Sequence, residues 1–396
     1  MGQNVKATGS TLSKLKWGRN RYANLHTYID NTPLKQRPMS DKPVLCFMLD
    51  KVTRSTVFPE DGLCHFLFLE VRIDASKIAY TNGDELLQRF YANAENSSST
   101  GYGLSIKADA VPAAYGSING ISGSLQELWS RNIRHFGVSD QKLVHDDTPS
   151  AYYEVSLLLG NVRSLQGQFK NYNAEPPSYI ILSVIPPDRL GRTDEDLFFV
   201  EAVGNLIRHF SPDALVLTTV AFNALKEPCR VTGPTPWNDD TDPDKGYLMV
   251  RVLEAWRKAS ISQSVRLLIS FTASGFAYTA TATHPFVSTD GEGASCEQAA
   301  VAPRNDFCRI NSTIKDNGTV LQYGIKDGVL YAFDTADTME EKMCRAAVDY
   351  NFQGGYCMFS IENADSTNAC DDDKYKGDLI IVHHLKDLAA KTFTSC

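Results

Sequence analysis

Short apolar runs alternate along this chain with longer segments of helical periodicity, and this alternation restricts the fold more than any other feature. Seven such runs lie at 44–49, 65–71, 103–108, 179–185, 214–222, 266–273 and 356–361. Amphipathic segments separate them, for example at 125–136, 154–169 and 198–210. Continuous apolar runs are typical of strands buried on both faces, and strands that alternate with helices predict a parallel sheet. With 138–145 as an eighth strand, the pattern predicts an α/β fold, a (β/α)8 TIM barrel; an open doubly wound sheet is the alternative.

Two segments depart from this rhythm and define the predicted domain organisation. Residues 1–42 are rich in Lys and Arg, poor in periodic hydrophobics and broken by prolines. They predict a basic N-terminal extension that is flexible or lies on the surface, whereas 43–396 would form the barrel. Residues 279–330, between the seventh and eighth predicted strands, are rich in Thr, Ser, Gly and Asn. We expect them to form a small insertion on the rim of the barrel.

Composition excludes several classes of function. The net charge of −8 argues against nucleic acid as the main partner. No run of 18 apolar residues exists, so the sequence predicts no membrane span. No cysteine lies in a CxxC pair, and we predict neither a cofactor nor a resident metal. The acidic run at 239–244 is typical of a solvated loop, with a weak calcium site as the alternative.

The cysteines and the glycosylation sequons bear on the compartment. Nine scattered cysteines favour disulfides in an oxidising environment, and buried free thiols in a cytosolic protein are the alternative. Because nine is odd, at least one thiol is unpaired or bonds another chain. Sequons at Asn96, Asn311 and Asn317 agree with a secreted glycoprotein. We therefore expect an extracellular protein, although residues 1–26 contain no signal-peptide segment, so the chain is either a trimmed or incomplete secreted form or cytosolic.

Several motifs appear in order along residues 43–390. VLCFML and GLCHFLF are followed by SIKA, KEPCRVTGPTPW, LLISFTASGFAY and GGYCMFSIENAD. Their order and spacing resemble glycoside hydrolase family 18, the chitinases and chitinase-like lectins. The resemblance implies a TIM barrel whose first two strands are joined by a disulfide between Cys46 and Cys64. It also implies that Cys370 pairs with Cys296 or Cys308, since the family ties its insertion to the segment after strand eight.

The fourth strand of that family carries the acids Asp-x-x-Asp-x-Asp-x-Glu. The Glu protonates the leaving oxygen, and the neighbouring Asp orients the acetamido group of the substrate. The segment FGVSDQKLVHDD resembles this strand without its acids, because the three Asp positions and the Glu position hold Ser139, Lys142, Val144 and Asp146. A shorter Asp without acidic neighbours would lie too far back and ionise too readily to act as the general acid. No register within 136–150 restores the motif, and Asp140 fits its spacing in none of them.

Other positions of the cleft are also altered. Val220 and Ala221 stand where strand six of the family carries Tyr-Asp, and Phe359 stands where its last strand carries Trp. The resemblance therefore implies a pseudoenzyme with no catalytic residues. Side chains expected at the carboxyl ends of the strands, where barrel sites lie, are Phe47, Asp146, Phe222, Trp237, Phe359 and Glu362. Aromatic faces stack on sugar rings, so these side chains could bind glycans; the alternative is that Phe47 and Phe359 fill the barrel mouth.

Three hypotheses of function follow. The first is a secreted, catalytically inactive chitinase-like lectin that binds chitin-type oligosaccharides containing N-acetylglucosamine. The second is a barrel that serves as a protein-interaction or structural component, with the unpaired cysteine allowing a disulfide-linked dimer. The third is a glycosidase of altered specificity that uses Asp146, with Glu362 as a distant partner.

Overall fold

The computed structural model describes residues 39–396 except 50, 75–76, 81–82, 117, 144–148, 170–176, 188–189, 191–192, 222–227, 239–247, 260–263, 311–312, 366, 368, 371, 373 and 377. Only residues 39–42 of the expected N-terminal extension are therefore described. The acidic run at 239–244 lies outside the described residues. No helix in the described part of the chain is long and apolar enough to cross a membrane.

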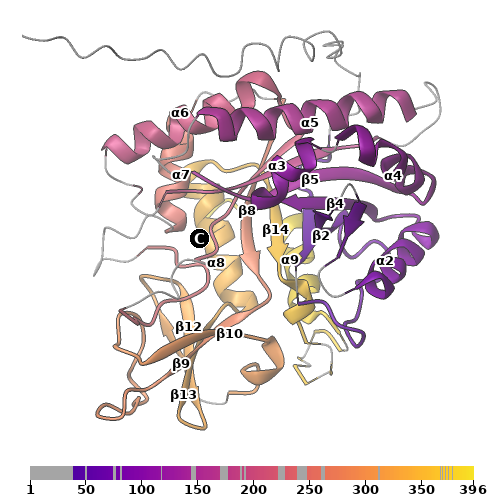
Figure 1. Cartoon of the computed structure of the whole chain (residues 1–396). Coiled ribbons are helices and arrows are strands. Elements are labelled where there is room, and N and C mark those ends of the chain that lie inside the picture. Colours follow the sequence, from indigo (N-terminus) through magenta and orange to yellow (C-terminus); the bar gives the residue numbers. More distant parts are fainter. Residues whose placement is uncertain are drawn as a thin grey trace, which may run out of the picture. The chain divides into compact units, whose positions relative to one another are not determined.

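Eight parallel strands close into a barrel (Figure 1). In chain order they are β1 (Val44–Met48), β2 (Phe66–Asp74), β4 (Gly101–Lys107), β5 (Ile133–Lys142), β6 (Ile180–Ile185), β7 (Ala214–Leu217), β8 (Arg266–Thr272) and β14 (Gly355–Phe359). β14 pairs with β1, and β1 pairs with β2, which closes the ring. The short β3 (Lys77–Ala79) pairs antiparallel with the end of β2. The predicted (β/α)8 barrel is confirmed, and the open sheet is excluded.

The barrel strands alternate in sequence with helices. These are α2 (Asp84–Asn96), α3 (Val111–Gly116), α4 (Ile118–Ser130), α5 (Pro149–Phe169), α6 (Thr193–His209), α7 (Met249–Lys258), α8 (Ala336–Tyr350) and α9 (Ile380–Ala390). Short 3-10 turns lie at η1 (Ala108–Ala110), η3 (Arg304–Asp306) and η4 (Ile361–Asn363). Figure 1 shows α7 and α8 running beside β8 and β14.

Two apolar cores explain why the strands are apolar along their whole length. Residues of one parity point into the barrel, among them Leu45, Phe68 and Leu268. Residues of the other parity, such as Leu104 and Leu182, pack against the helices. A strand buried on both faces has no polar side, so its sequence shows no alternation.

The insertion between the seventh and eighth barrel strands is an antiparallel sheet in the order β10-β9-β13-β12-β11 (orange, Figure 1). Its strands are β9 (Gly275–Thr279), β10 (Gln298–Ala302), β11 (Thr313–Asp316), β12 (Leu321–Lys326) and β13 (Val329–Phe333). It buries a core of its own that includes Phe276, Tyr278 and Tyr323. The sheet therefore begins directly after β8, slightly before the expected start at 279.

Eight of the nine cysteines form four disulfides. The pairs are Cys46–Cys64, Cys229–Cys296, Cys308–Cys370 and Cys344–Cys396. The first is the bond that the family resemblance implies. Cys370 pairs with Cys308, one of the two partners expected for it. The remaining thiol, Cys357, is fully buried inside the barrel on β14. A second chain could not reach it in the folded state, so this thiol does not support the predicted disulfide-linked dimer.

Candidate functional site

The carboxyl end of β5, where the family would carry its catalytic acids, contains a β-bulge. Val138 pairs with Leu182 and Gln141 with Val184, so three steps along β5 match two along β6. Asp140 has a φ of 59°, a left-handed conformation that is uncommon for Asp. Bulges re-aim side chains and are frequent beside functional sites. Spacing rules for a regular strand therefore fail beyond Ser139.

Ser139, at the first of the replaced acid positions, is fully buried and donates a hydrogen bond to a carboxylate from another strand. Its Oγ lies 2.7 Å from Oε2 of Glu70 on β2. The other oxygen of Glu70, Oε1, lies 4.0 Å from Nζ of Lys107 at the end of β4. The mouth of the barrel thus has a buried acid on β2, bound by a serine and facing an ammonium group.

Sequence reasoning missed Glu70, although a signal existed. Phe66, Phe68 and Glu70 share one parity of β2, and Phe68 points into the barrel. A Glu in an otherwise apolar inward-facing row is costly to bury without partners. Its presence in HFLFLEV could therefore have indicated a polar partner on a neighbouring strand.

Asp140 also acts on the interior of the barrel. Burial raises the pKa of the Cys357 thiol well above its ordinary value, and the negative charge of Asp140 raises it further. Asp140 must lie near the interior for its charge to be felt there. Asp140 fits the family motif in no register. The bulge explains why it still contributes an acid to this region.

The other replaced positions lie at the end of β5 or beyond the described residues. Lys142 pairs with Ile185 and is exposed at the strand end. Val144 and Asp146 lie outside the described residues, as does Phe222. Their predicted roles therefore stay predictions.

Phe47 and Phe359 are packed inside the barrel instead of offering their faces to a ligand. Their exposed fractions are 1% and 0%, and their ring centroids lie 5.0 Å apart. Phe47 also stacks on Phe68 at 5.0 Å. This packing does not support the predicted stacking of these rings on sugars, and it agrees with the alternative that they fill the barrel. The physical reason is that neighbouring strands supply enough apolar surface to cover both rings.

Trp237 lies in the layer between the barrel and the helices, which corrects its expected position in the cleft. Only 5% of its surface is exposed. Its indole meets the edge of Tyr350 at 5.9 Å, and the guanidinium of Arg345 lies 5.9 Å from its centre. Its backbone N donates to Thr319 O at 2.8 Å. A tryptophan in a proline-rich loop is thereby folded onto α8, and no local sequence signal indicates this.

Glu362 follows β14 in η4, as expected for a residue at the carboxyl ends of the strands. Its Oε2 accepts a hydrogen bond from the Leu49 amide at 3.2 Å. Next to it, Asn363 donates through Nδ2 to Ser274 Oγ at 2.9 Å. These bonds hold the ends of β1, β8 and β14 together at the rim.

Hydroxyl groups line the carboxyl ends of the central strands. Ser183 on β6 and Thr218 after β7 are hydrogen-bonded at 3.0 Å, and both are fully buried. Thr219 N donates to Ser270 Oγ at 2.9 Å. Val220 and Ala221 follow and are buried. This side of the barrel therefore holds buried neutral hydroxyls that are hydrogen-bonded to one another, with no acid at the Tyr-Asp positions of the family.

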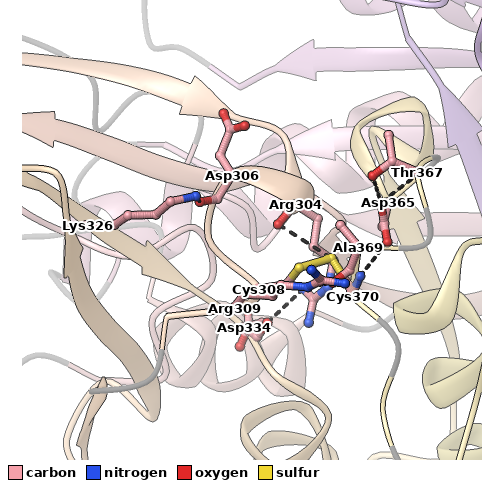
Figure 2. The surroundings of a disulfide bond; sticks show 10 residues. All are labelled: Arg304, Asp306, Cys308, Arg309, Lys326, Asp334, Asp365, Thr367, Ala369 and Cys370. Atoms are coloured by element: carbon pink, nitrogen blue, oxygen red, sulfur yellow. Dashed lines mark hydrogen bonds between the residues drawn. A yellow bond between two sulfur atoms is a disulfide. The ribbon is translucent and has the colours of Figure 1, made fainter.

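A disulfide and a hydrogen bond from Arg309 to the carbonyl of Ala369 fix the segment after β14 to the insertion (Figure 2). Asp365, buried, accepts from the amide of Thr367 at 2.9 Å and that of Cys370 at 2.6 Å. Arg304 donates to Asp334 O at 3.0 Å. Burial lowers the pKa of Arg304 to about 10, while nearby Asp334, Asp365 and Asp372 raise it. The rim is thus held by a disulfide and hydrogen bonds between distant parts of the chain.

Two of the three predicted glycosylation sites can be located. Asn96 is exposed at the end of α2, where its Nδ2 donates to Ala92 O at 2.8 Å. Asn317 is exposed in the turn between β11 and β12. Asn311 lies outside the described residues. Among the described residues, no group of three or more His, Cys, Asp or Glu side chains could hold a metal ion.

Sequence comparison identifies no relatives. No family model matches the chain, and no curated protein matches it.

Solved structures do match. Human YKL-39, a pseudo-chitinase with retained chitooligosaccharide binding properties, is 15% identical with a TM-score of 0.67, over 88% of this chain and all of that one. An immunomodulatory active chitinase from Trichuris suis is 12% identical with a TM-score of 0.66, over 88% and 99% of the two chains. A chitinase-like agglutinin from Robinia pseudoacacia is 16% identical with a TM-score of 0.63, over 86% and 98%. The chain therefore has the fold of the chitinases and chitinase-like proteins of glycoside hydrolase family 18.

Proposed function

We propose that the protein is a secreted, catalytically inactive chitinase-like protein that binds glycans containing N-acetylglucosamine at the carboxyl end of the barrel. The observation that carries this proposal is the hydrogen bond from Ser139 to Glu70. Ser139 is an alcohol that is already engaged as a donor, and the resemblance expects the first acid of the catalytic strand at this position.

The loss of chemistry is argued from what the reaction needs. A general acid must give a proton to the leaving oxygen from within hydrogen-bond reach. Ser139 is too weak an acid to do so, and the exposed Lys142 is a cation where the family carries an Asp. Glu70 is turned toward Ser139 and Lys107. These three residues support binding and positioning of polar groups better than they support proton transfer.

Glycan binding is supported by the exposed ammonium of Lys142 at the carboxyl end of β5, which can donate hydrogen bonds to sugar hydroxyls. Two proteins of the same fold are a pseudo-chitinase with retained chitooligosaccharide binding and an agglutinin. Four disulfides support the oxidising compartment, where Asn96 and Asn317 would accept glycans.

Calorimetric titration with chitohexaose tests this proposal. We expect saturable heat of binding and no continuing heat of hydrolysis. Lys142→Met, which removes an exposed charge at the carboxyl end of β5, should weaken binding, whereas the matched control Lys258→Met, at the exposed end of α7 away from the mouth, should not. Continuing heat would refute inactivity and favour a glycosidase of altered specificity. Absence of heat at several temperatures would refute glycan binding at this site.

The burial of the predicted aromatic contacts favours one second candidate. Phe47, Phe359 and Trp237 offer no open ring face for a sugar, so the barrel could instead serve as a protein-interaction or structural component. Its marker is a partner that copurifies with the chain and stays bound in excess chitohexaose. Release of that partner by the oligosaccharide would instead favour the lectin.

A further inference from the structure

A second cavity lies at the opposite end of the barrel from Ser139. It has a volume of about 460 Å³ and lies between the end of α7, the start of β8 and the turn from α8 into β14. Because β8 and β14 begin here, this is the amino-terminal face of the barrel. The cavity is within the size range of small-molecule sites in proteins.

Three aromatic rings form the apolar wall of this cavity. Trp256 and Tyr350 are half-buried, and Phe352 is buried. Tyr350 is held edge-on against Trp237 at 5.9 Å, and Phe352 against Tyr356 at 6.0 Å. Tyr350 and Phe352 are therefore already fixed by their neighbours, and a ligand would not have to order these two rings.

The backbone of the turn is shaped to leave this space. Asn351, with a φ of 52°, ends α8 in the left-handed conformation. A Cβ at Gly354 would lie 2.2 Å from Leu267 O and 2.5 Å from the Phe352 ring. Glycine at 354 thus allows the turn to pack directly on the start of β8 beneath the cavity.

The charged residues that line the cavity all carry positive charge. Arg257 is exposed and forms no ion pair with any described residue, and Arg266 lies on the other side. Arg266 pairs with Asp41 at 3.2 Å, but the Asp41 side chain is 98% exposed, so that pair is weak and easily exchanged. No acidic residue is among those that line the cavity in the described part of the chain. The nearby Glu254 is paired with Arg251 at 3.3 Å, and the nearby Asp349 lies on the exposed face of α8.

We propose that this cavity binds a small organic anion with a flat apolar body, such as an aromatic carboxylate or sulfonate. The guanidinium group matches the geometry of a carboxylate and stacks on ring systems, and the three aromatic rings accept the apolar body. This site is independent of the glycan site, because it lies at the other end of the barrel.

Fluorescence titration with 8-anilinonaphthalene-1-sulfonate tests the proposal, under conditions where near-ultraviolet circular dichroism shows the native fold. We expect saturable enhancement with about one probe per chain. Arg257→Met, which keeps the apolar stem and removes the charge, should weaken binding about tenfold. Arg54→Met removes an equally exposed arginine far from the cavity and should leave binding unchanged. Trp256→Ala should abolish most of the enhancement.

A neutral probe of similar shape, N-phenyl-1-naphthylamine, separates the two parts of the proposal. We expect it to bind wild type and Arg257→Met equally, because it makes no use of the charge. Equal losses of both probes in Arg257→Met would overturn the role of the arginine. Unchanged sulfonate binding in both Arg257→Met and Trp256→Ala would overturn the site.

Discussion

Replacing Ser139 with Ala would test the polar contact that stands in place of the catalytic acid. The substitution removes one hydrogen bond of 2.7 Å to the Glu70 carboxylate and opens little space. Glu70 is only 7% exposed, so water cannot easily replace the lost donor. A hydrogen bond to a charged group contributes about 1.5–3 kcal/mol. Because Glu70 keeps Lys107 beside its other oxygen, only this hydrogen bond is lost, and we expect Ser139→Ala to lower the free energy of unfolding by about 2 kcal/mol.

Urea denaturation followed by circular dichroism measures this loss, with Ser183→Ala as the control. Ser183 is equally buried, but its partner is the neutral hydroxyl of Thr218, so the expected loss is about 1 kcal/mol. A double-mutant cycle with Glu70→Gln should show coupling between positions 70 and 139. If Ser139→Ala costs no more than Ser183→Ala and shows no coupling to Glu70, the account of this contact is refuted.

Three further predictions concern stability. Lys342→Met would leave the fully buried Asp334 without its ion pair of 2.5 Å. In urea denaturation, the free energy of unfolding should fall by about 3–5 kcal/mol, and a loss below about 1 kcal/mol would contradict this. Cys396→Ser opens the disulfide to Cys344, which spans 52 residues of sequence, and chain entropy predicts that the free energy of unfolding falls by up to about 4 kcal/mol. The loss is measurable as a lower Tm, and an unchanged Tm would show that the bond contributes nothing to stability. Burial and the charge of a nearby lysine lower the pKa of His65 from its ordinary 6.5, so protonation favours the unfolded state. The contribution of His65 to stability should therefore be complete above pH 6.5 and fall as the pH drops toward the folded pKa. In pH-dependent melting, His65→Gln should flatten this slope.

The barrel could be predicted from sequence because its strands are apolar on both faces. In a chain where helical segments separate the apolar runs, a run such as 179–185 is interpreted as a strand buried on both faces. The insertion could be located for the same reason, since its Thr- and Gly-rich composition interrupts the pattern. The Cys46–Cys64 bond could be named only through the family resemblance, which left two partners open for Cys370.

The details of the site could not be predicted, because they depend on contacts between distant strands. The bulge at Asp140 changes which side chains of β5 point inward, and the left-handed residue itself is an Asp, not the glycine that would mark such a position in the sequence. Trp237 is covered by Arg345 and Tyr350 of α8, which lie far along the chain. The sequence could have singled out Glu70 as a buried acid, but its partner Ser139 can be named only when β2 and β5 are known to be neighbours of β4. Motif spacing assumes a regular strand, and the regular strand ends at Ser139.

A crystal structure of the chain soaked with chitohexaose would test the central claim most directly. The account predicts an unbroken oligosaccharide at the carboxyl ends of the barrel strands, with its polar groups hydrogen-bonded to side chains of the barrel mouth. Cleaved products at that site would contradict inactivity, and an empty mouth at saturating oligosaccharide would contradict the assignment of glycan binding to it.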